Sequence, residues 1–219
     1  MTSSINKPRA RGRLSREMIE TTAFLVIERE GLAAFSTRKL AVELGCEAMS
    51  IYHHFPSKAH LFEALVDRVV GALAIPPAHL PWRKRMHIAM ADFRAAARAR
   101  PAFAPFLVTY RMNSPTCLAW LDSIIGLFKD GGFPPERAAR LFRVVGYYLM
   151  GAVLDETAGY AKGSSAVTTV SDEQLARDFP NVAAAGRFFS PGEFGKTFDV
   201  GLEMLLDEME RELTRGKEN

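Results

Sequence analysis

Apolar residues recur three and four positions apart along most of the chain, which is the spacing of helices that bury one face. The first such segment begins at Ser15, a residue type that caps helix N-termini, and ends at Gly31. The pattern predicts a helix here, with one stripe turned inward. That stripe is Met18, Ile19, Thr22, Ala23, Val26 and Ile27.

Three further helices are predicted before residue 77. Ser36 can cap a helix over Thr37–Leu44, and Gly45 ends it. The next runs over Ala48–Phe55 and stops before a Pro-Ser pair, and another runs from Ser57 to Val70. The buried face of this last helix is expected to be Leu61, Phe62, Leu65, Val66 and Val69.

Beyond the prolines at 76 and 77 the pattern is helical throughout, and no alternation typical of strands competes with it. Residues Ala161–Val170 are expected to form a flexible loop, and Ser171–Phe188 one or two weaker helices. The longer predicted helices are Trp82–Arg98, Ala102–Arg111, Thr116–Lys129, Pro135–Tyr160 and Pro191–Leu213. The sequence therefore predicts an all-α protein with a small head over 15–70 and a larger helical domain over 71–219.

Composition is that of a globular protein, with 48% apolar and 24% charged residues. No apolar run is long enough to span a bilayer, and the two cysteines, Cys46 and Cys117, fall in different predicted domains. We therefore expect an intracellular, cytoplasmic protein that has no membrane partner and no disulfide scaffold.

Charge is concentrated at the N-terminus. Residues 1–16 hold five basic residues and no acid, whereas residues 17–219 hold 23 basic and 25 acidic residues, so the net charge of +3 comes from this first stretch. The residues 1–14 are predicted to form a basic arm, disordered alone, which either orders on nucleic-acid phosphates or serves only as a solubilising tail.

The helices on either side of Gly45 have the features of a helix-turn-helix. Ala41 is small where a second helix must approach, Gly45 can adopt the left-handed conformation of a tight turn, and Ile51 can lock the second helix on the first. The fold class predicted is therefore an N-terminal three-helix helix-turn-helix head followed by a larger helical bundle.

Polar groups at the helix starts suit a DNA duplex. Thr37 and Arg38 begin a helix whose free amides favour phosphate, and Lys58 adds a cation at the start of a later helix. The helix between them presents short or polar groups that can enter a major groove. These are Ala48, Ser50, Tyr52 and His53.

The run Ser50-Ile-Tyr-His-His-Phe-Pro-Ser-Lys-Ala-His-Leu-Phe-Glu-Ala-Leu65, behind Thr37 to Gly45, resembles the signature of TetR-family transcriptional regulators. The resemblance implies phosphate contacts from Thr37, Tyr52, His53 and Lys58, and base contacts from Ala48, Met49 and Ser50. Glu47 departs from the usual small hydroxyl residue at the helix start, although a carboxylate can also cap it. The segment Phe194–Glu210 resembles the last helix of the tetracycline-repressor-type C-terminal domain. This resemblance does not imply that the chain binds the same drug.

A single head offers few contacts, so a homodimer on a palindromic operator is expected, with recognition helices about 34 to 36 Å apart. Pro135–Tyr160 is apolar nearly all round, and the last helix has a second apolar stripe, formed by Phe198, Leu202, Leu205, Leu206, Met209 and Leu213. These two helices either form a four-helix interface with a second copy or are internal core.

Aromatic and methionine side chains gather in the middle helices. We expect an apolar or aromatic effector to bind among them and to displace the helix from Ser57 to Val70; the alternative is that they are plain core. The predicted ligand-binding residues are Met90, Phe93, Phe103, Phe106, Tyr110, Trp120 and Tyr147. The expected action is repression, with activation as an open alternative.

Other classes of function find little support. The sequence has no phosphate-binding glycine loop, HExxH motif, nucleophile elbow or paired Cys-x-x-Cys, so we expect neither an enzyme nor a cofactor. His53, His54 and His60 match no standard metal spacing. A dimeric helical scaffold or ligand-binding protein without DNA binding is the remaining alternative.

Overall fold

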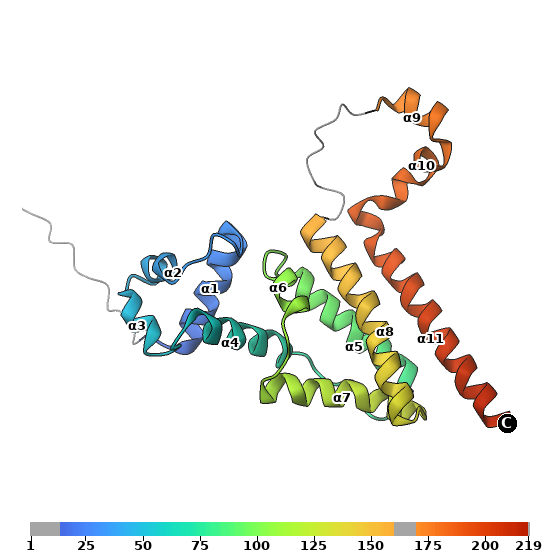
Figure 1. Ribbon diagram of the computed structural model, residues 1–219, viewed down its shortest axis with the longest axis horizontal. Coiled ribbons are helices and arrows are strands. Elements are labelled where there is room, and N and C mark those ends of the chain that lie inside the picture. Colours follow the sequence, from blue (N-terminus) through green and yellow to red (C-terminus); the bar gives the residue numbers. More distant parts are fainter. Residues whose placement is uncertain (1–13, 160–169, 219) are drawn as a thin grey trace, which may run out of the picture. The chain divides into compact units, whose positions relative to one another are not determined.

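The computed structural model describes residues 14–159 and 170–218, which form helices and turns with no strand among them (Figure 1). The all-α prediction is confirmed. The chain divides into two compact units between Arg68 and Val69. The predicted basic arm, except for its last residue, lies outside the described residues, as does the predicted loop up to residue 169.

The N-terminal unit contains α1 (Arg16–Glu30), α2 (Thr37–Leu44), α3 (Ala48–Tyr52) and most of α4 (Lys58–Val70). Ser15 caps α1 by accepting a hydrogen bond from the Met18 amide, and Gly31, with φ +84°, ends it. Each helix turns one apolar face inward, so residues distant in sequence share one small core. Its most deeply buried members include Ile19, Ile27, Leu40, Ile51, Phe55, Leu61 and Leu65.

Two details of the first helices differ from the prediction. Met18, predicted on the inward face of α1, is 44% exposed, whereas Phe24, which was not predicted there, is buried. Helix α3 ends at Tyr52 instead of Phe55. The Ile51 carbonyl accepts from the amides of both His54 and Phe55, at 2.9 Å each, and this tight turn brings the Phe55 ring into the core before Pro56.

The C-terminal unit contains five helices that pack on one another and a further set of short elements. The former are α5 (Trp82–Arg98), α6 (Ala104–Thr109), α7 (Pro115–Gly131), α8 (Pro135–Leu154) and α11 (Phe194–Glu218). The latter are the π-helix η1 (Asp155–Gly159), α9 (Asp172–Asp178), α10 (Pro180–Ala185), and the 3₁₀ turns η2 (Gly186–Phe189) and η3 (Pro191–Glu193). Helices α5, α6 and α7 pack with α8 around one core that contains Met86, Phe103, Leu107, Leu127 and Phe128.

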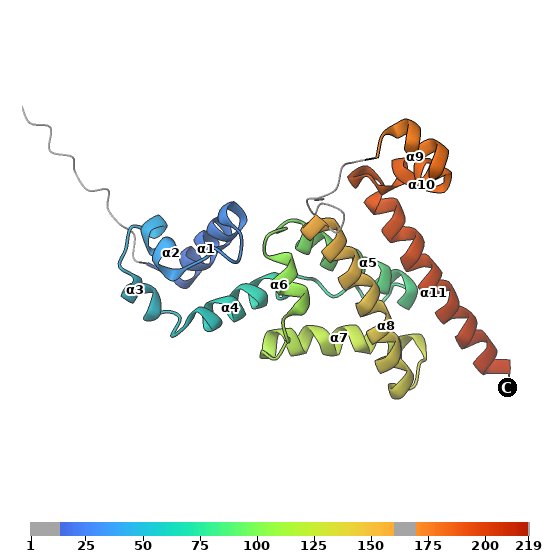
Figure 2. The same cartoon turned by 45° about the horizontal axis from the view of Figure 1, so that its top comes forward.

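Helices α8 and α11 lie side by side and run in opposite directions (Figures 1 and 2). Arg137 near the start of α8 pairs with Glu212 near the end of α11, and Tyr148, further along α8, stacks on Phe198 near the start of α11. Gly201 permits this close approach, because a side chain there would collide with the Tyr148 ring. The two helices therefore form one continuous layer of the unit.

The element bounds also differ in places from those expected. Helix α6 is shorter at both ends than predicted, and α11 begins at Phe194, three residues later than expected, because Pro191–Glu193 forms a 3₁₀ turn. The predicted helix to residue 160 becomes a π-helix from Asp155 onward. The segment Ser171–Phe188, predicted as one or two weaker helices, contains α9, α10 and most of η2.

The π-helix places Glu156 inside the unit. Its side chain is 3% exposed and pairs with Arg94 and Arg98 of α5, with closest separations of 2.9 and 3.2 Å. The Arg94 guanidinium lies 4.6 Å from the centre of the Phe198 ring. This cluster joins α5, η1 and α11, and the buried Glu156 carboxylate belongs to the π-helical turn.

Candidate DNA interface and effector cavity

Helices α2 and α3 meet at a tight turn in the N-terminal unit. Gly45 has φ +63° and ψ +36°, the left-handed conformation, and its amide bonds back to the end of α2. The Cys46 amide donates to the Ala41 carbonyl at 3.0 Å. Ala41 and Ile51 are both buried. The predicted roles of the small residue, the glycine and the aliphatic residue correspond to this crossing of two helices.

Replacing Gly45 with alanine is expected to lower the free energy of unfolding by about 1–2 kcal/mol, because a Cβ is strained in the left-handed region. Gly126→Ala is the matched control. Gly126 lies within α7, and a Cβ there would meet no heavy atom within 4 Å, so the helix should gain about 1 kcal/mol. Urea unfolding followed by circular dichroism measures both, and equal shifts of the same sign would contradict this account of the turn.

The residues predicted to contact DNA form one exposed edge of this unit. The Thr37 hydroxyl lies 3.0 Å from the Tyr52 hydroxyl, so α2 and α3 present two adjoining hydroxyls. Arg38 and His53 are exposed, and Met49 is 63% exposed at the start of α3. Ala48 and Ser50 are partly exposed. This edge can donate hydrogen bonds to an anion while the side chains of α3 remain accessible.

Lys58 is held in place by aromatic neighbours. Its Nζ donates to the Phe35 carbonyl at 3.1 Å and lies 5.3 and 5.1 Å from the centres of the Phe35 and Phe62 rings. An ammonium has three donors, so two remain for another partner. The sequence indicated the cation but not these contacts, which depend on how α4 packs against the residues before α2.

The start of α3 differs from the expectation for Glu47. This residue occupies the N-cap position with φ −79° and ψ +146°, but its side chain makes no capping hydrogen bond. The α3 amides are therefore not covered by the carboxylate. Arg16, which the sequence analysis did not assign to the site, donates to the His54 carbonyl at 2.7 Å and lies over the Phe55 ring.

The C-terminal unit contains a cavity of about 390 Å³ between α5, α7, α8 and residues 108–113. Its floor is formed by buried side chains of α5 and α7. These are Met86, Met90, Phe93, Trp120, Ile124 and Phe128. From α8 it is lined by Phe142, Val145, Gly146 and Leu149. Such a volume and such an apolar lining are typical of small-molecule sites.

Four of the seven predicted ligand-binding residues line this cavity, and three do not. Those lining it are Met90, Phe93, Tyr110 and Trp120. Phe103 is fully buried beside it, and Phe106 packs between Phe103 and Tyr110, with ring centres 5.5 and 5.1 Å away. Tyr147 is 62% exposed and bonds to Arg143 on the surface of α8.

The rim of the cavity contains polar residues that the sequence analysis did not select. Arg111, Asn113 and Arg143 line it and are exposed. They are polar, whereas the predicted ligand-binding residues are aromatic or methionine. Arg111 and Asn113 follow α6 in an irregular segment, and Arg143 lies beside Phe142, a residue of the cavity lining.

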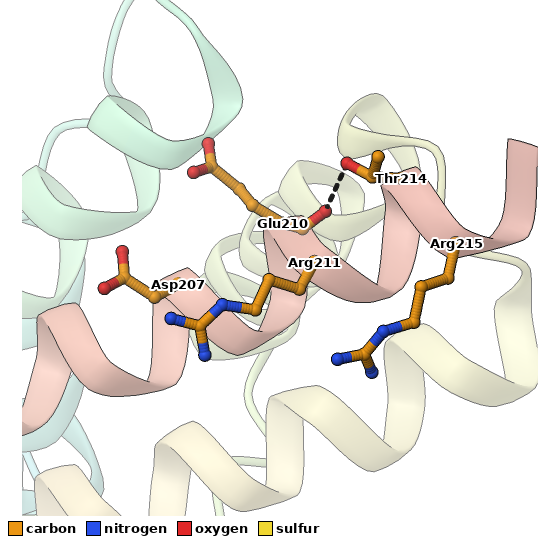
Figure 3. Close-up of a pocket in the computed structure, with 5 residues that line it drawn as sticks. All are labelled: Asp207, Glu210, Arg211, Thr214 and Arg215. Carbon is orange, nitrogen blue, oxygen red and sulfur yellow. Dashed lines mark hydrogen bonds between the residues drawn. The ribbon is translucent and has the colours of Figure 1, made fainter.

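A shallow hollow lies along α11 (Figure 3). It is lined by Asp207, Glu210, Arg211, Thr214 and Arg215. Its charges are satisfied within the protein, since Asp207 and Glu210 pair with Arg83, and both arginines pair with Glu208. The hollow is therefore a surface of paired charges on one helix, unlike the apolar cavity.

Helices α8 and α11 also carry apolar side chains on their outer surface. Val144, Tyr147, Val200 and Met204 are all exposed, although each belongs to a helix whose other face is buried.

Between the two helices, burial raises the pKa of the Tyr148 phenol, so the phenol stays protonated and donates to the Phe198 carbonyl at 2.7 Å. The layer is thus fixed internally while an apolar face remains outside.

The described residues contain neither a metal-binding cluster nor a membrane-spanning helix. In residues 14–159 and 170–218, no three His, Cys, Asp or Glu side chains come together as a metal site. No helix within these same ranges combines the length and the apolar character needed to cross a bilayer.

Comparison with known families matches both parts of the chain. Residues 19–65 match the family of bacterial regulatory proteins called the tetR family, and residues 76–213 match the tetracyclin repressor-like C-terminal domain. The second match alone covers more than half of the chain. The resemblance inferred from the sequence is therefore confirmed over both domains.

Individual relatives agree with these matches. An HTH-type transcriptional regulator of Saccharopolyspora erythraea is 26% identical over 196 residues, which cover 88% of this chain and 83% of that protein. The class A tetracycline repressor of Escherichia coli, from transposon 1721, is 26% identical over 198 residues, or 89% of this chain and 90% of the repressor.

Solved structures share the fold. A possible TetR family transcriptional regulator from Streptomyces coelicolor superposes with a TM-score of 0.75 at 24% identity, over 90% of this chain and 99% of that one. The TetR family protein ActR from the same organism, in complex with (S)-DNPA, superposes with a TM-score of 0.69 at 23% identity, over 90% of this chain and 96% of that one. The chain belongs to the TetR family of transcriptional regulators, with a helix-turn-helix head and a tetracyclin repressor-like C-terminal domain.

Proposed function

We propose that this regulator is a ligand-responsive repressor that binds a palindromic operator as a homodimer. The observation that carries the proposal is the juxtaposition of the Thr37 and Tyr52 hydroxyls across the turn at Gly45. In this arrangement both hydroxyls can bind one stretch of DNA backbone while α3 enters the adjoining major groove. The predicted basic arm would add electrostatic attraction.

The proposed contacts divide into two kinds. Thr37, Arg38, Tyr52, His53 and Lys58 would bind phosphates and set the position of the head on the duplex. The exposed start of α3, with Ala48, Met49 and Ser50, would contact base edges. A methionine and an alanine at these positions would favour apolar contact with thymine methyl groups.

The exposed apolar face of α8 and α11 would form the dimer interface. Two such faces related by a two-fold axis bring four helices together, and this arrangement buries side chains that the single chain leaves exposed. The other interpretation of these helices, as purely internal core, does not account for the exposure of Val144, Tyr147, Val200 and Met204.

Replacing Tyr147 and Met204 together with glutamate is expected to raise the dimer dissociation constant by at least about a hundredfold. Each substitution occurs twice in the dimer and would bury a charge without a partner. Light scattering after size exclusion measures the mass. Leu25→Glu, on an exposed apolar residue of α1, is the control and should leave the dimer unchanged. If the control variant became monomeric while the Tyr147 and Met204 variant stayed dimeric, the proposed interface would be contradicted.

The cavity in the C-terminal unit would bind a small effector. The ligand-bound ActR structure supports this, because that protein shares the fold and carries a small molecule. For release from DNA the effector must prefer the DNA-incompetent conformation, and moving the population from 1:99 to 99:1 requires about a 10⁴-fold preference. Helix α4, which continues through the boundary between the units, would transmit the change.

Binding of the purified protein to the DNA upstream of its own gene tests the proposal. Footprinting should show two protected half-sites about one helical turn apart, and a ligand that fills the cavity should release them. Protection of a single half-site, or none at any salt concentration, would contradict the repressor model and favour a helical dimer that does not bind DNA. As a transcription regulator the protein would act in the cytoplasm and would need no catalytic residue or cofactor.

A further inference from the structure

The cavity of the C-terminal unit has an apolar floor and a cationic rim. The floor residues Met86, Ile124 and Phe128 are buried and carry no charge. Two charged residues line the cavity, and both are arginines, Arg111 and Arg143. None of the described lining residues is Asp or Glu. A ligand in this cavity would therefore meet positive charge, and no negative charge, among the described lining residues.

Other arginines of the same unit are paired with carboxylates. Arg85 pairs with Asp130 at 2.6 Å, Arg94 with Glu156 at 2.9 Å, and Arg137 with Glu212. Within residues 14–159 and 170–218, by contrast, Arg111 makes no ion pair or hydrogen bond. Its positive charge at the rim is thus without an opposite charge among the described residues.

Arg143 is oriented but not neutralised. Its Nη2 donates to the Tyr147 hydroxyl at 2.8 Å, and its guanidinium carbon lies 4.7 Å from the centre of that ring. A guanidinium has five N–H donors, so most of them remain free for a ligand. Asn113 offers an amide at the same rim.

This distribution favours one chemical class of ligand. A neutral apolar molecule would leave the exposed guanidinium groups to water and would gain no interaction from them. A carboxylate or sulfonate on the same molecule would instead accept charge-assisted hydrogen bonds from a guanidinium. The floor would still hold the apolar body.

We infer that the effector is an amphipathic acid: an apolar or aromatic body that lies on the methionine and aromatic floor, with one anionic group at Arg111 and Arg143. The inference rests on the proposed function, because it takes this cavity as the effector site. It adds the charge of the ligand, which the predicted apolar or aromatic effector left open.

Two fluorescent probes with the same ring system test the inference on the full-length protein. 8-Anilinonaphthalene-1-sulfonate carries an anionic group, and N-phenyl-1-naphthylamine lacks it. The anionic probe is expected to bind at least about tenfold more tightly. Arg111→Gln combined with Arg143→Gln should abolish this preference and leave the affinity for the neutral probe unchanged. Arg140→Gln, on an exposed arginine of α8 outside the cavity, should keep it.

Gly146→Leu identifies the part of the signal that comes from the cavity. Gly146 lines the cavity, and a Cβ there would meet only the Met150 side chain, at 4.0 Å, so a leucine can fill the space without a backbone clash. Both probes should lose the cavity-dependent part of their binding in this variant. Circular dichroism and light scattering confirm that each variant is folded and dimeric.

The outcomes separate the inference from the proposed function. Equal affinity for the two probes, or an unchanged preference in the double arginine variant, would overturn the anionic effector while leaving the cavity as the effector site. Failure of both probes to bind, or binding that Gly146→Leu does not reduce, would overturn the cavity as the effector site and the inference with it.

Discussion

Replacing both Tyr52 and Lys58 with alanine is expected to lower the affinity for the operator by about a hundred- to a thousandfold. The dimer loses four phosphate contacts, and about 1 kcal/mol for each corresponds to this range. The slope of log affinity against log salt should also fall in magnitude by about two, one for each Lys58 of the dimer. Fluorescence anisotropy with a labelled operator measures both quantities.

A matched variant controls for the general charge of the head. Lys39→Ala also removes one cation per chain, but Lys39 pairs with Glu30 at 2.6 Å and bonds to the Ala34 carbonyl, so its charge is used within the protein. We expect less than about a threefold loss of affinity from this change. Because Lys58 also contacts Phe35, the melting temperature of each variant has to be compared. Equal losses in both variants would contradict the proposed edge.

Glu156→Ala is expected to lower the free energy of unfolding by about 3–5 kcal/mol, the largest effect on stability that we anticipate. The change leaves Arg94 without its carboxylate, in a position where its side chain is 12% exposed and lies against Phe198. A buried charge that loses its partner retains its full desolvation cost. Thermal and urea unfolding of the dimer at fixed protein concentration measure the loss.

The double variant Arg94→Met, Glu156→Leu separates the charge from the packing. Removing both charges and keeping apolar volume should restore most of the stability, since apolar replacements of buried pairs are often neutral or stabilising. If the double variant were as unstable as Glu156→Ala, the loss would come from the π-helix itself and not from the unpaired arginine.

Local signals in the sequence predicted several helix bounds, both with and without a capping side chain. Helix α5 has the bounds expected from the pattern, and Ser15, Ser36 and Gly45 occupy the capping positions expected of them. Such signals act within four residues of the helix end, so the sequence alone contains them. The resemblance of the head to the family's signature also depends on a local run of residues, the one around α3.

Features that depend on distant partners could not be predicted in this way. The π-helix at Asp155 accompanies the pairing of Glu156 with arginines of α5, some 60 residues earlier. Apolar residues occur on both the buried and the exposed side of α8, so its pattern did not show that Tyr147 lies on the outer surface. The packing of α6, α7 and α8 also determines which arginines lie at the cavity rim, and no sequence motif marks them.

Hydrogen–deuterium exchange of the dimer with and without its operator duplex tests the central claim most directly, which is that the edge formed by α2, α3 and the start of α4 contacts DNA. The account predicts that slower exchange on adding DNA is concentrated in residues 36–58. Exchange unchanged in these residues while DNA is bound, with the protection found in the C-terminal unit instead, would contradict it.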